Sequence, residues 1–376
     1  MYIHLPFCSG RCHYCDFVSN VGRGRAVPRY LDALEAESRL RAFPQPETLY
    51  VGGGTPTELD AKQLADLFAL IGRSFPSARW RESTVEANPE NLDREKLGVL
   101  KGNGVTRLSL GLQTSDDRLL RRIGRRHDYA DFLRAYGEAR AAGFSVSMDL
   151  MFGLPGQTIE GLSASIEAVL ALEPEHLSVY GLDVHEGTPF GREGARCDED
   201  LGREMFELVI DRLTRAGYHH YEISNFALPG RECVHNQIYW RNGEYVGLGC
   251  AASSCINGER STNVERLDEY CSRALSGKSP VAHSERLSGK ERLGEEVMLG
   301  LRLLDGVELE PEAKAAFASE IESLRGRGLV VLEGARLRLT REGLFLANLV
   351  FLEFVAPFAG PIIRTGAPVR AQEVTA

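Results

Sequence analysis

Three cysteines near the start of the chain are the residues whose types and spacing point most directly to chemistry. They are Cys8, Cys12 and Cys15, in the arrangement C-x-x-x-C-x-x-C within one short segment. Thiolates are soft ligands that suit zinc and iron–sulfur centres. A closed iron–sulfur cube usually takes four cysteines. Three cysteines on one loop would therefore bind three irons and leave the fourth iron open.

An open iron is what S-adenosylmethionine requires, because its amino and carboxylate groups chelate that iron before an electron from the cluster cleaves the sulfonium bond. Tyr14 directly precedes Cys15 and is placed to cover the cluster or the adenine. The alternatives are a zinc knuckle or chance clustering. Zinc would need a fourth Cys or His, and His13 lies too close in sequence to complete a tetrahedron comfortably. The spacing favours the open iron–sulfur site.

Composition bounds the class of protein. The chain has 376 residues, of which 43% are hydrophobic and 26% charged, and its formal net charge is −9. This is typical of a globular protein with one large domain and a smaller one. The negative charge argues against nucleic acid as the main partner. No apolar run approaches the roughly 20 residues of a membrane span.

The start of the chain bears on its location. A strand-like segment at residues 2–5 stands where a secretory leader would have a charged and then an apolar stretch. We therefore expect a cytoplasmic protein, in which the eight cysteines are reduced thiols or metal ligands rather than disulfides.

Strand-like segments alternate with helical ones along the first half of the chain. Strands are expected at residues 2–5, 48–51, 83–89, 107–114, 145–153 and 176–182, and helices at 29–41, 60–72 and 94–101. Alternation of this kind predicts an α/β fold with a parallel sheet or a barrel, and an incomplete barrel is one form that it can take.

Polar residues stand at the carboxyl ends of four expected strands. They are Thr55, Glu86, Gln113 and Asp149, and the first follows a glycine run that includes Gly53 and Gly54. Each residue alone is typical of a strand-end cap, and the glycine run alone is typical of a turn. Parallel α/β folds bind ligands at the carboxyl ends of their strands, so four such residues together favour a binding site.

The motifs YIHLPFCSGRCHYCDF, GGGTPT, EANP, LGLQT, GRRH and DLMFGLPGQT stand in the order found in radical S-adenosylmethionine enzymes. From Tyr2 to about Leu304 the chain resembles the branch that contains oxygen-independent coproporphyrinogen III oxidase and the HemW-type haem chaperones. This resemblance implies an incomplete (β/α)6 radical SAM barrel and a 4Fe–4S cluster on Cys8, Cys12 and Cys15. The residues that it implies for S-adenosyl-L-methionine are Tyr2, Tyr14, Gly53, Gly54, Thr55, Glu86, Gln113, Arg125 and Asp149.

Two features separate the members of this branch. The oxidases carry a fourth cysteine two residues after the third, where this chain has Phe17, as the chaperones do. Residues 233–240, CVHNQIYW, match the HNxxYW motif of the chaperones, whose histidine is associated with haem. The resemblance therefore implies His235 as a haem ligand, with Cys233 as a competitor, since imidazole and thiolate are both axial ligands of haem iron. The alternative is a histidine hydrogen-bonded in the core.

One segment departs from the family pattern. Ser253 stands where the family has a histidine, after the stretch Tyr245–Ala252. Cys250 and Cys255 lie close by, and they are either an additional metal site or, as we favour, small buried apolar residues.

The end of the chain predicts a separate module. Helices are expected from residue 295 and at 311–325, followed by a hairpin at 329–339 and a helix at 340–354, which together outline a winged helix. Winged helices often bind DNA, but this segment is not strongly basic, and a lid or docking module is preferred. The expected organisation is a core barrel (1–230), a haem-motif extension with a linker at 275–289 (231–290), a C-terminal helical module (291–355) and a mobile tail (356–376).

The sequence thus predicts a haem chaperone with a 4Fe–4S cluster and S-adenosyl-L-methionine, which carries haem as cargo to client haem proteins such as respiratory enzymes. A transient contact with a membrane surface is compatible with this function, and no nucleic-acid partner is expected. Two enzymatic alternatives stay open: coproporphyrinogen III oxidase, and a related radical SAM methyltransferase or cyclopropane-forming enzyme. Phe17 argues against the oxidase.

Overall fold

A nine-stranded sheet organises the computed structural model, which describes residues 1–40, 43–196 and 198–355. The strands of this sheet are, in spatial order, β11 (Gly247–Leu248), β1 (Tyr2–Leu5), β4 (Thr48–Gly53), β5 (Glu82–Ala87), β6 (Arg107–Gln113), β7 (Ser145–Phe152), β8 (His176–Gly181), β10 (Asn225–Ala227) and β9 (His219–Glu222). All neighbours from β11 to β8 pair in parallel, while β10 is antiparallel to both β8 and β9. The six strands expected from the sequence are confirmed as β1 and β4–β8.

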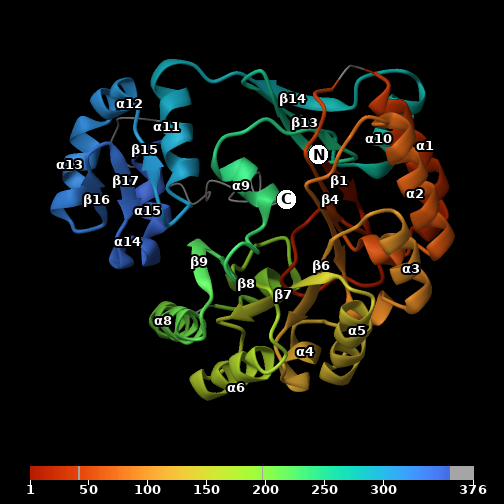
Figure 1. Ribbon diagram of the computed structural model, residues 1–376, viewed down its shortest axis with the longest axis horizontal. Helices are drawn as coiled ribbons and strands as arrows, with labels where there is room; N and C mark the ends of the chain where they lie inside the picture. The colour runs from red at the N-terminus through yellow and green to blue at the C-terminus, as the bar shows by residue number, and fades with distance from the viewer. Residues whose placement is uncertain (41–42, 197, 356–376) are drawn as a thin grey trace.

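Helices follow the parallel strands and cover the sheet (Figure 1). They are α1 (Val27–Ser38), α2 (Ala61–Ser74), α3 (Arg94–Gly102), α4 (Asp117–Arg122), α5 (Tyr129–Ala141), α6 (Ile159–Leu170), α7 (Pro189–Glu193) and α8 (Glu199–Arg215), with short 3-10 turns at Gly24–Ala26, Pro56–Glu58 and Pro89–Asn91. Helix α2 shows the physical basis. Asp60 and Gln63 form a capping box at its start, and Leu64, Leu67 and Ile71 share the buried face. The open parallel sheet covered by helices confirms the predicted α/β fold.

The chain beyond the barrel strands returns to the sheet. Helix α9 (Val234–Trp240) is followed by β11, which pairs with β1, and by a second sheet of β12 (Ser253–Ile256), β13 (Glu259–Asn263) and β14 (Val281–Glu285). Helix α10 (Leu267–Leu275) lies against α1. The stretch 275–289, expected to be a linker, thus contains strand β14. Its polar composition misled the prediction, because β14 is held by pairing with β13 and most of its side chains are exposed.

A buried carboxylate joins this second sheet to the barrel. Glu37, at the end of α1, is 5% exposed. Its carboxylate accepts hydrogen bonds from the backbone N–H of Gly249 at 2.9 Å, from Asn263 Nδ2 at 2.6 Å and from the hydroxyl of Tyr270. One side chain therefore fixes the loop after β11, the end of β13 and helix α10 to the first barrel helix.

A C-terminal module lies beside the barrel, with α9 between the two in the view of Figure 1. It comprises α11 (Gly289–Gly300), β15 (Val307–Glu308), α12 (Pro311–Ala316), α13 (Ala318–Gly326), β16 (Val330–Glu333), β17 (Arg336–Leu339), α14 (Arg341–Phe345) and α15 (Ala347–Leu352). The hairpin expected at 329–339 is confirmed as β16 and β17. The two helices expected around it are each divided, at Phe317 and at Leu346, where the backbone leaves helical geometry.

Two further expectations concern the tail of the chain and a membrane span. The tail 356–376, expected to be mobile, lies outside the described residues. Within the described ranges, no helix combines the length and the apolar composition that crossing a membrane requires.

The contacts of Glu37 generate a stability prediction. Glu37→Ala would leave three buried donors without their acceptor, and hydrogen bonds to a charged group contribute about 1.5–3 kcal/mol each. We expect the free energy of unfolding to fall by about 3 kcal/mol or more, measured as a lower urea midpoint by far-UV circular dichroism. Glu35→Ala on the same helix is the control, because it removes partly exposed ion pairs with Arg39 and Arg73 that contribute about 1 kcal/mol or less. Equal midpoints for the two variants would contradict this anchoring role.

Candidate functional site

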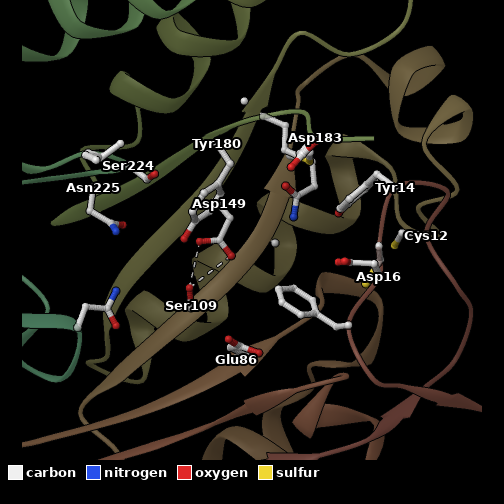
Figure 2. A pocket seen from close by; sticks show the side chains of 18 of the residues that line it. Cys12, Tyr14, Asp16, Glu86, Ser109, Asp149, Tyr180, Asp183, Ser224 and Asn225 are labelled. Carbon is white, nitrogen blue, oxygen red and sulfur yellow. Dashed lines mark hydrogen bonds between the residues drawn. The ribbon is translucent and has the colours of Figure 1, made fainter. Parts of the chain in front are cut away.

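A cavity of about 650 Å³ opens at the carboxyl ends of the parallel strands. It brings together most of the site residues expected from the sequence. Those that line it are Cys8, Cys12, Tyr14, Cys15, Gly53, Gly54, Thr55, Glu86, Gln113, Arg125 and Asp149. Figure 2 shows Cys12, Tyr14 and Asp16 at one end of this cavity, Glu86 and Asp149 in the middle, and Ser224 and Asn225 at the other end.

The cysteine segment is a loop fastened at both ends. Cys8 ends strand β2 (Phe7–Cys8), which pairs with β3 (Asn20–Val21). In between, His13 binds the body of the protein: its backbone N–H donates to the carbonyl of Ile123 at 2.9 Å, and its Nδ1 lies 2.8 Å from the carbonyl oxygen of Arg122. This histidine therefore anchors the loop to α4 and is engaged away from the thiols.

The donor set suits a cluster better than a single metal ion. Among the residues that the structure describes, no three His, Cys, Asp or Glu side chains converge closely enough to hold one ion. A cube needs no such convergence, because each cysteine binds a different iron. Polar groups also lie beside the sulfurs, with Thr55 Oγ1 3.6 Å from Cys8 Sγ and an Arg125 guanidinium nitrogen 3.6 Å from Cys12 Sγ. Outer groups of this kind orient and tune metal ligands.

The glycine run allows three chain segments to meet under the cavity. Gly53 has a φ of 110°, and a Cβ on Gly54 would lie 2.7 Å from the carbonyl oxygen of Phe7. The close approach lets the N–H of Gly53 donate to Glu86 Oε2 at 3.1 Å, while the hydroxyl of Tyr50 donates to Oε1 at 2.9 Å. The run is therefore more than a turn, because it positions a buried carboxylate.

The next strand ends are also specialised. Gln113 has a φ of 72° beside an irregularity in the pairing of β6 with β7, a strained conformation that is typical of functional sites. The hydroxyl of Ser109 donates to Asp149 at 3.1 Å. Arg125 donates to Asn88 Oδ1 at 2.7 Å and to the carbonyl of Gly111 at 2.8 Å, but its buried Nε has no partner. A cavity with an unpartnered guanidinium donor fits a ligand with a carboxylate.

Burial perturbs both central carboxyl groups. It raises the pKa of Glu86 to about 7, with Asp149 adding to the shift and Tyr50 opposing it. It raises the pKa of Asp149 to about 6, against the hydrogen bond from Ser109. Two carboxyl groups kept from water in one cavity favour a cationic ligand, because a positive charge stabilises their ionised forms.

Two expected site residues do not line the cavity. Tyr2 is 5% exposed, and its hydroxyl lies 3.0 Å from Nδ1 of His4. His235 is 1% exposed, with its Nδ1 2.7 Å from Thr48 Oγ1, its Nε2 2.8 Å from the hydroxyl of Tyr239, and its ring stacked on Tyr50. Burial lowers the pKa of His235 well below its usual value. This is the arrangement of a histidine hydrogen-bonded in the core, the alternative that the sequence left open.

The other cysteines of the extension lie in the interior. Cys250 is fully buried, and its backbone N–H donates to the hydroxyl of Tyr30 at 3.0 Å, while Cys255 is 6% exposed. Ser253, at the position of the family's histidine, bonds Thr262 Oγ1 at 2.9 Å across β12 and β13.

Several cavity residues were not expected from the sequence. They are Tyr50, Asn88, Ser109, Tyr180, Asp183, His185, Glu222, Asn225, Asn236, Arg302 and residues 344–349 of the C-terminal module. Trp240, an aromatic residue of the expected haem motif, lines the cavity as well. His185 is the sole histidine among the described lining residues, and its ring nitrogens lie 3.6 Å from Asp16 and 3.5 Å from Asp183. Ser109 and Tyr180 lie in two of the expected strands, β6 and β8, so the strand pattern could have predicted them. Arg302 comes from the C-terminal module, which the pattern does not connect to the barrel.

Comparison with known proteins identifies the family. The model of the radical SAM superfamily matches residues 2–169, and that of the HemN C-terminal domain matches residues 287–346. The protein named "Heme chaperone HemW" in Bacillus subtilis is 40% identical over 94% of this chain and 98% of its own length. The protein of the same name in Lactococcus lactis is 36% identical over 94% of this chain and 96% of its own length. The chain belongs to the HemW haem chaperone family.

A solved structure supports the fold of this HemW-family chain over nearly its full length. The radical SAM enzyme coproporphyrinogen III oxidase (HemN) from Escherichia coli superposes with a TM-score of 0.82 at 25% identity, over 94% of this chain and 89% of that one. A 4Fe–4S cluster and S-adenosylmethionine are characteristic of the radical SAM superfamily that matches here. The three thiols, the buried carboxylates and the unpartnered Arg125 donor fit these two groups.

The raised pKa values generate a prediction about pH. S-adenosylmethionine is cationic, so its binding beside these carboxyl groups would favour ionised Glu86 and Asp149, whose pKa values without a ligand are about 7 and about 6. Ionisation is lost as the pH falls through these values, so we expect the dissociation constant to rise about tenfold from pH 7.5 to pH 6. Calorimetry on anaerobically reconstituted protein measures this. Glu86→Gln should bind more weakly and lose most of the pH dependence, and an equally steep profile in that variant would exclude Glu86 as its source.

Proposed function

We propose that this chain binds haem and delivers it to client haem proteins, and that it carries a 4Fe–4S cluster and S-adenosyl-L-methionine in the cavity. The observation that carries the proposal is its 40% identity, over nearly its full length, to a protein named as a haem chaperone. Phe17 agrees with it, since this residue lines the cavity at the position where the oxidase branch has a fourth cysteine.

In this proposal the residues of the cavity divide the work. Cys8, Cys12 and Cys15 bind the cluster, and Tyr14 covers it. Glu86, Gln113 and Asp149 orient the polar groups of S-adenosylmethionine, beside the backbone of Gly53 to Thr55, and Arg125 pairs with its carboxylate. When bound, the cluster supplies an electron to S-adenosylmethionine. Tyr2 packs against Tyr50, with the ring centroids 6.2 Å apart, and so acts on the site through Tyr50.

The cavity also offers apolar surface for a flat macrocycle. Phe17 is 46% exposed, Tyr180 is 37% exposed and Leu349 is 48% exposed, and all three line the cavity. Exposed aromatic and aliphatic side chains of this kind suit a tetrapyrrole ring. Haem ligation by His235 stays a prediction. It requires one ring nitrogen to give up its hydrogen bond, to Thr48 or to Tyr239, because imidazole binds iron through a single nitrogen. His185 is the competing ligand within the cavity.

The setting of this function follows the expectations from the sequence. The proposed location is the cytoplasm, and the proposed recipients are haem proteins such as respiratory enzymes, reached with or without a transient contact at a membrane surface. We assign no nucleic-acid partner, because the formal net charge is −9.

The cluster assignment is tested on its ligands. Cys12→Ser replaces a soft thiolate by a hydroxyl, so we expect anaerobic reconstitution to yield a large loss of bound iron and of the reduced-state EPR signal. Cys255→Ser, a buried cysteine in β12, is the control and should retain both. Zinc in place of iron, or an unchanged cluster in the Cys12 variant, would refute the assignment.

The haem assignment is tested by titration. We expect about one haem per chain, followed by the Soret band under anaerobic conditions. If His235 ligates the iron, His235→Ala shifts the Soret band and weakens binding about tenfold or more. If the cavity histidine does so, His185→Ala has this effect and His235→Ala lowers only stability.

A second readout separates the chaperone from the oxidase. With a strong reductant and S-adenosylmethionine, we expect no conversion of coproporphyrinogen III, as followed by chromatography of the porphyrins. Sustained formation of protoporphyrinogen over several turnovers would overturn the chaperone proposal.

A further inference from the structure

Five unpartnered polar atoms belong to the wall of the cavity that lies away from the cysteine loop. In the described part of the chain, these buried atoms without a hydrogen-bond partner are Glu222 Oε2, Asn225 Oδ1, Asn236 Oδ1, Trp240 Nε1 and Arg302 Nε, and each residue lines the cavity. We name these five residues the polar wall. Burying a polar group without a partner is unfavourable, so five such atoms on one wall indicate a place that suits a polar ligand.

An arginine and a tryptophan form the centre of the polar wall. The guanidinium carbon of Arg302 lies 4.1 Å from the ring centroid of Trp240. The Arg302 side chain is 15% exposed, and its terminal nitrogen lies 4.0 Å from Glu222 Oε2, beyond hydrogen-bond distance. Trp240 itself is 3% exposed. Arg302 thus has a loosely paired charge, and both residues keep a free N–H donor.

Backbone hydrogen bonds attach the Arg302 side of the polar wall to the sheet. Arg302 follows α11 of the C-terminal module, and its carbonyl accepts from the N–H of Ile223 at 3.1 Å. The N–H of Leu304 donates to the carbonyl of Tyr221 at 3.1 Å. The segment that follows α11 is therefore fastened to the end of β9, and the backbone of Arg302 is held at the cavity independently of its side-chain contacts.

The donors define the chemistry of the ligand. A guanidinium over an indole ring, each with an N–H that has no partner, suits a carboxylate, because both groups are donors and the guanidinium supplies charge. Asn236 adds a donor when its amide is turned, since its oxygen has no partner to fix the orientation. An ionised Glu222 would repel an anion. Its Oε1 atom accepts hydrogen bonds from Asn225 Nδ2 and from the N–H of Ser224. Burial raises the pKa of Glu222, which favours the neutral acid.

The proposed occupant of this wall rests on the haem-carrying function above. We infer that Arg302 and Trp240, with Asn236, form a subsite for the propionate carboxylates of the haem cargo. The propionates then lie against the polar wall, and the macrocycle extends along the exposed side chains of Tyr180 and Leu349. The residues proposed for the cluster and S-adenosylmethionine lie away from this wall, with Cys12 and Tyr14 at the other end of the cavity and Glu86 and Asp149 in the middle (Figure 2).

The experiment compares haem with haem dimethyl ester, whose propionates carry no charge. Each is titrated in the same detergent by its Soret band against the full-length chain. We expect the parent protein to bind free haem at least tenfold more tightly than the diester. Trp240→Phe, which keeps an aromatic ring but lacks the indole N–H, and Arg302→Gln should each reduce this preference several-fold.

Controls separate recognition from folding. Arg241→Gln removes an exposed arginine directly after Trp240, whose guanidinium donates to Gln237 Oε1 at 3.0 Å, and should keep the full preference. Circular dichroism verifies the folding of each variant, and the comparison of the two ligands on the parent protein needs no variant. Equal affinity of the parent for both ligands, or full preference in both wall variants, would overturn the inference alone. Binding of neither ligand would overturn the proposed haem function and the inference with it.

Discussion

The burial of two carboxyl groups at the carboxyl edge of one parallel sheet is the constraint on which the rest of the site depends. Glu86 lies in β5 and Asp149 in β7, on either side of β6. Hydrogen bonds from Tyr50 and Gly53 hold Glu86 in place, and one from Ser109 holds Asp149. Desolvation destabilises their charges. A cationic ligand offsets that cost. Apolar residues at these positions would be more favourable for folding, so the two carboxyl groups indicate a place that is built for a ligand.

The second constraint is that the cavity is completed by a segment far away in the sequence. Arg302 and residues 344–349 reach the barrel from the C-terminal module. Backbone hydrogen bonds between residues 302–304 and 221–223 fasten this module to the sheet edge. The module therefore contributes to the site itself, which agrees with a lid or docking role rather than with DNA recognition.

The residues of the HNxxYW motif lie in two different surroundings. His235 is stacked on Tyr50 and bonded through both ring nitrogens, and it links β4 to α9. The same helix presents Trp240 to the cavity. In this conformation the aromatic end of the motif faces the ligand space, whereas the histidine supports the wall from behind.

The sequence by itself determined the parallel α/β fold, the cysteine loop and the strand-end residues Thr55, Glu86, Gln113 and Asp149. These follow from local signals, because alternating strands and helices bring all carboxyl ends to one edge. Only the tertiary structure decided that β14 is a strand, that His235 is buried and that Arg302 meets Trp240 and Glu222. Those outcomes depend on pairings between segments distant in the chain, whose burial and hydrogen bonding no local pattern encodes.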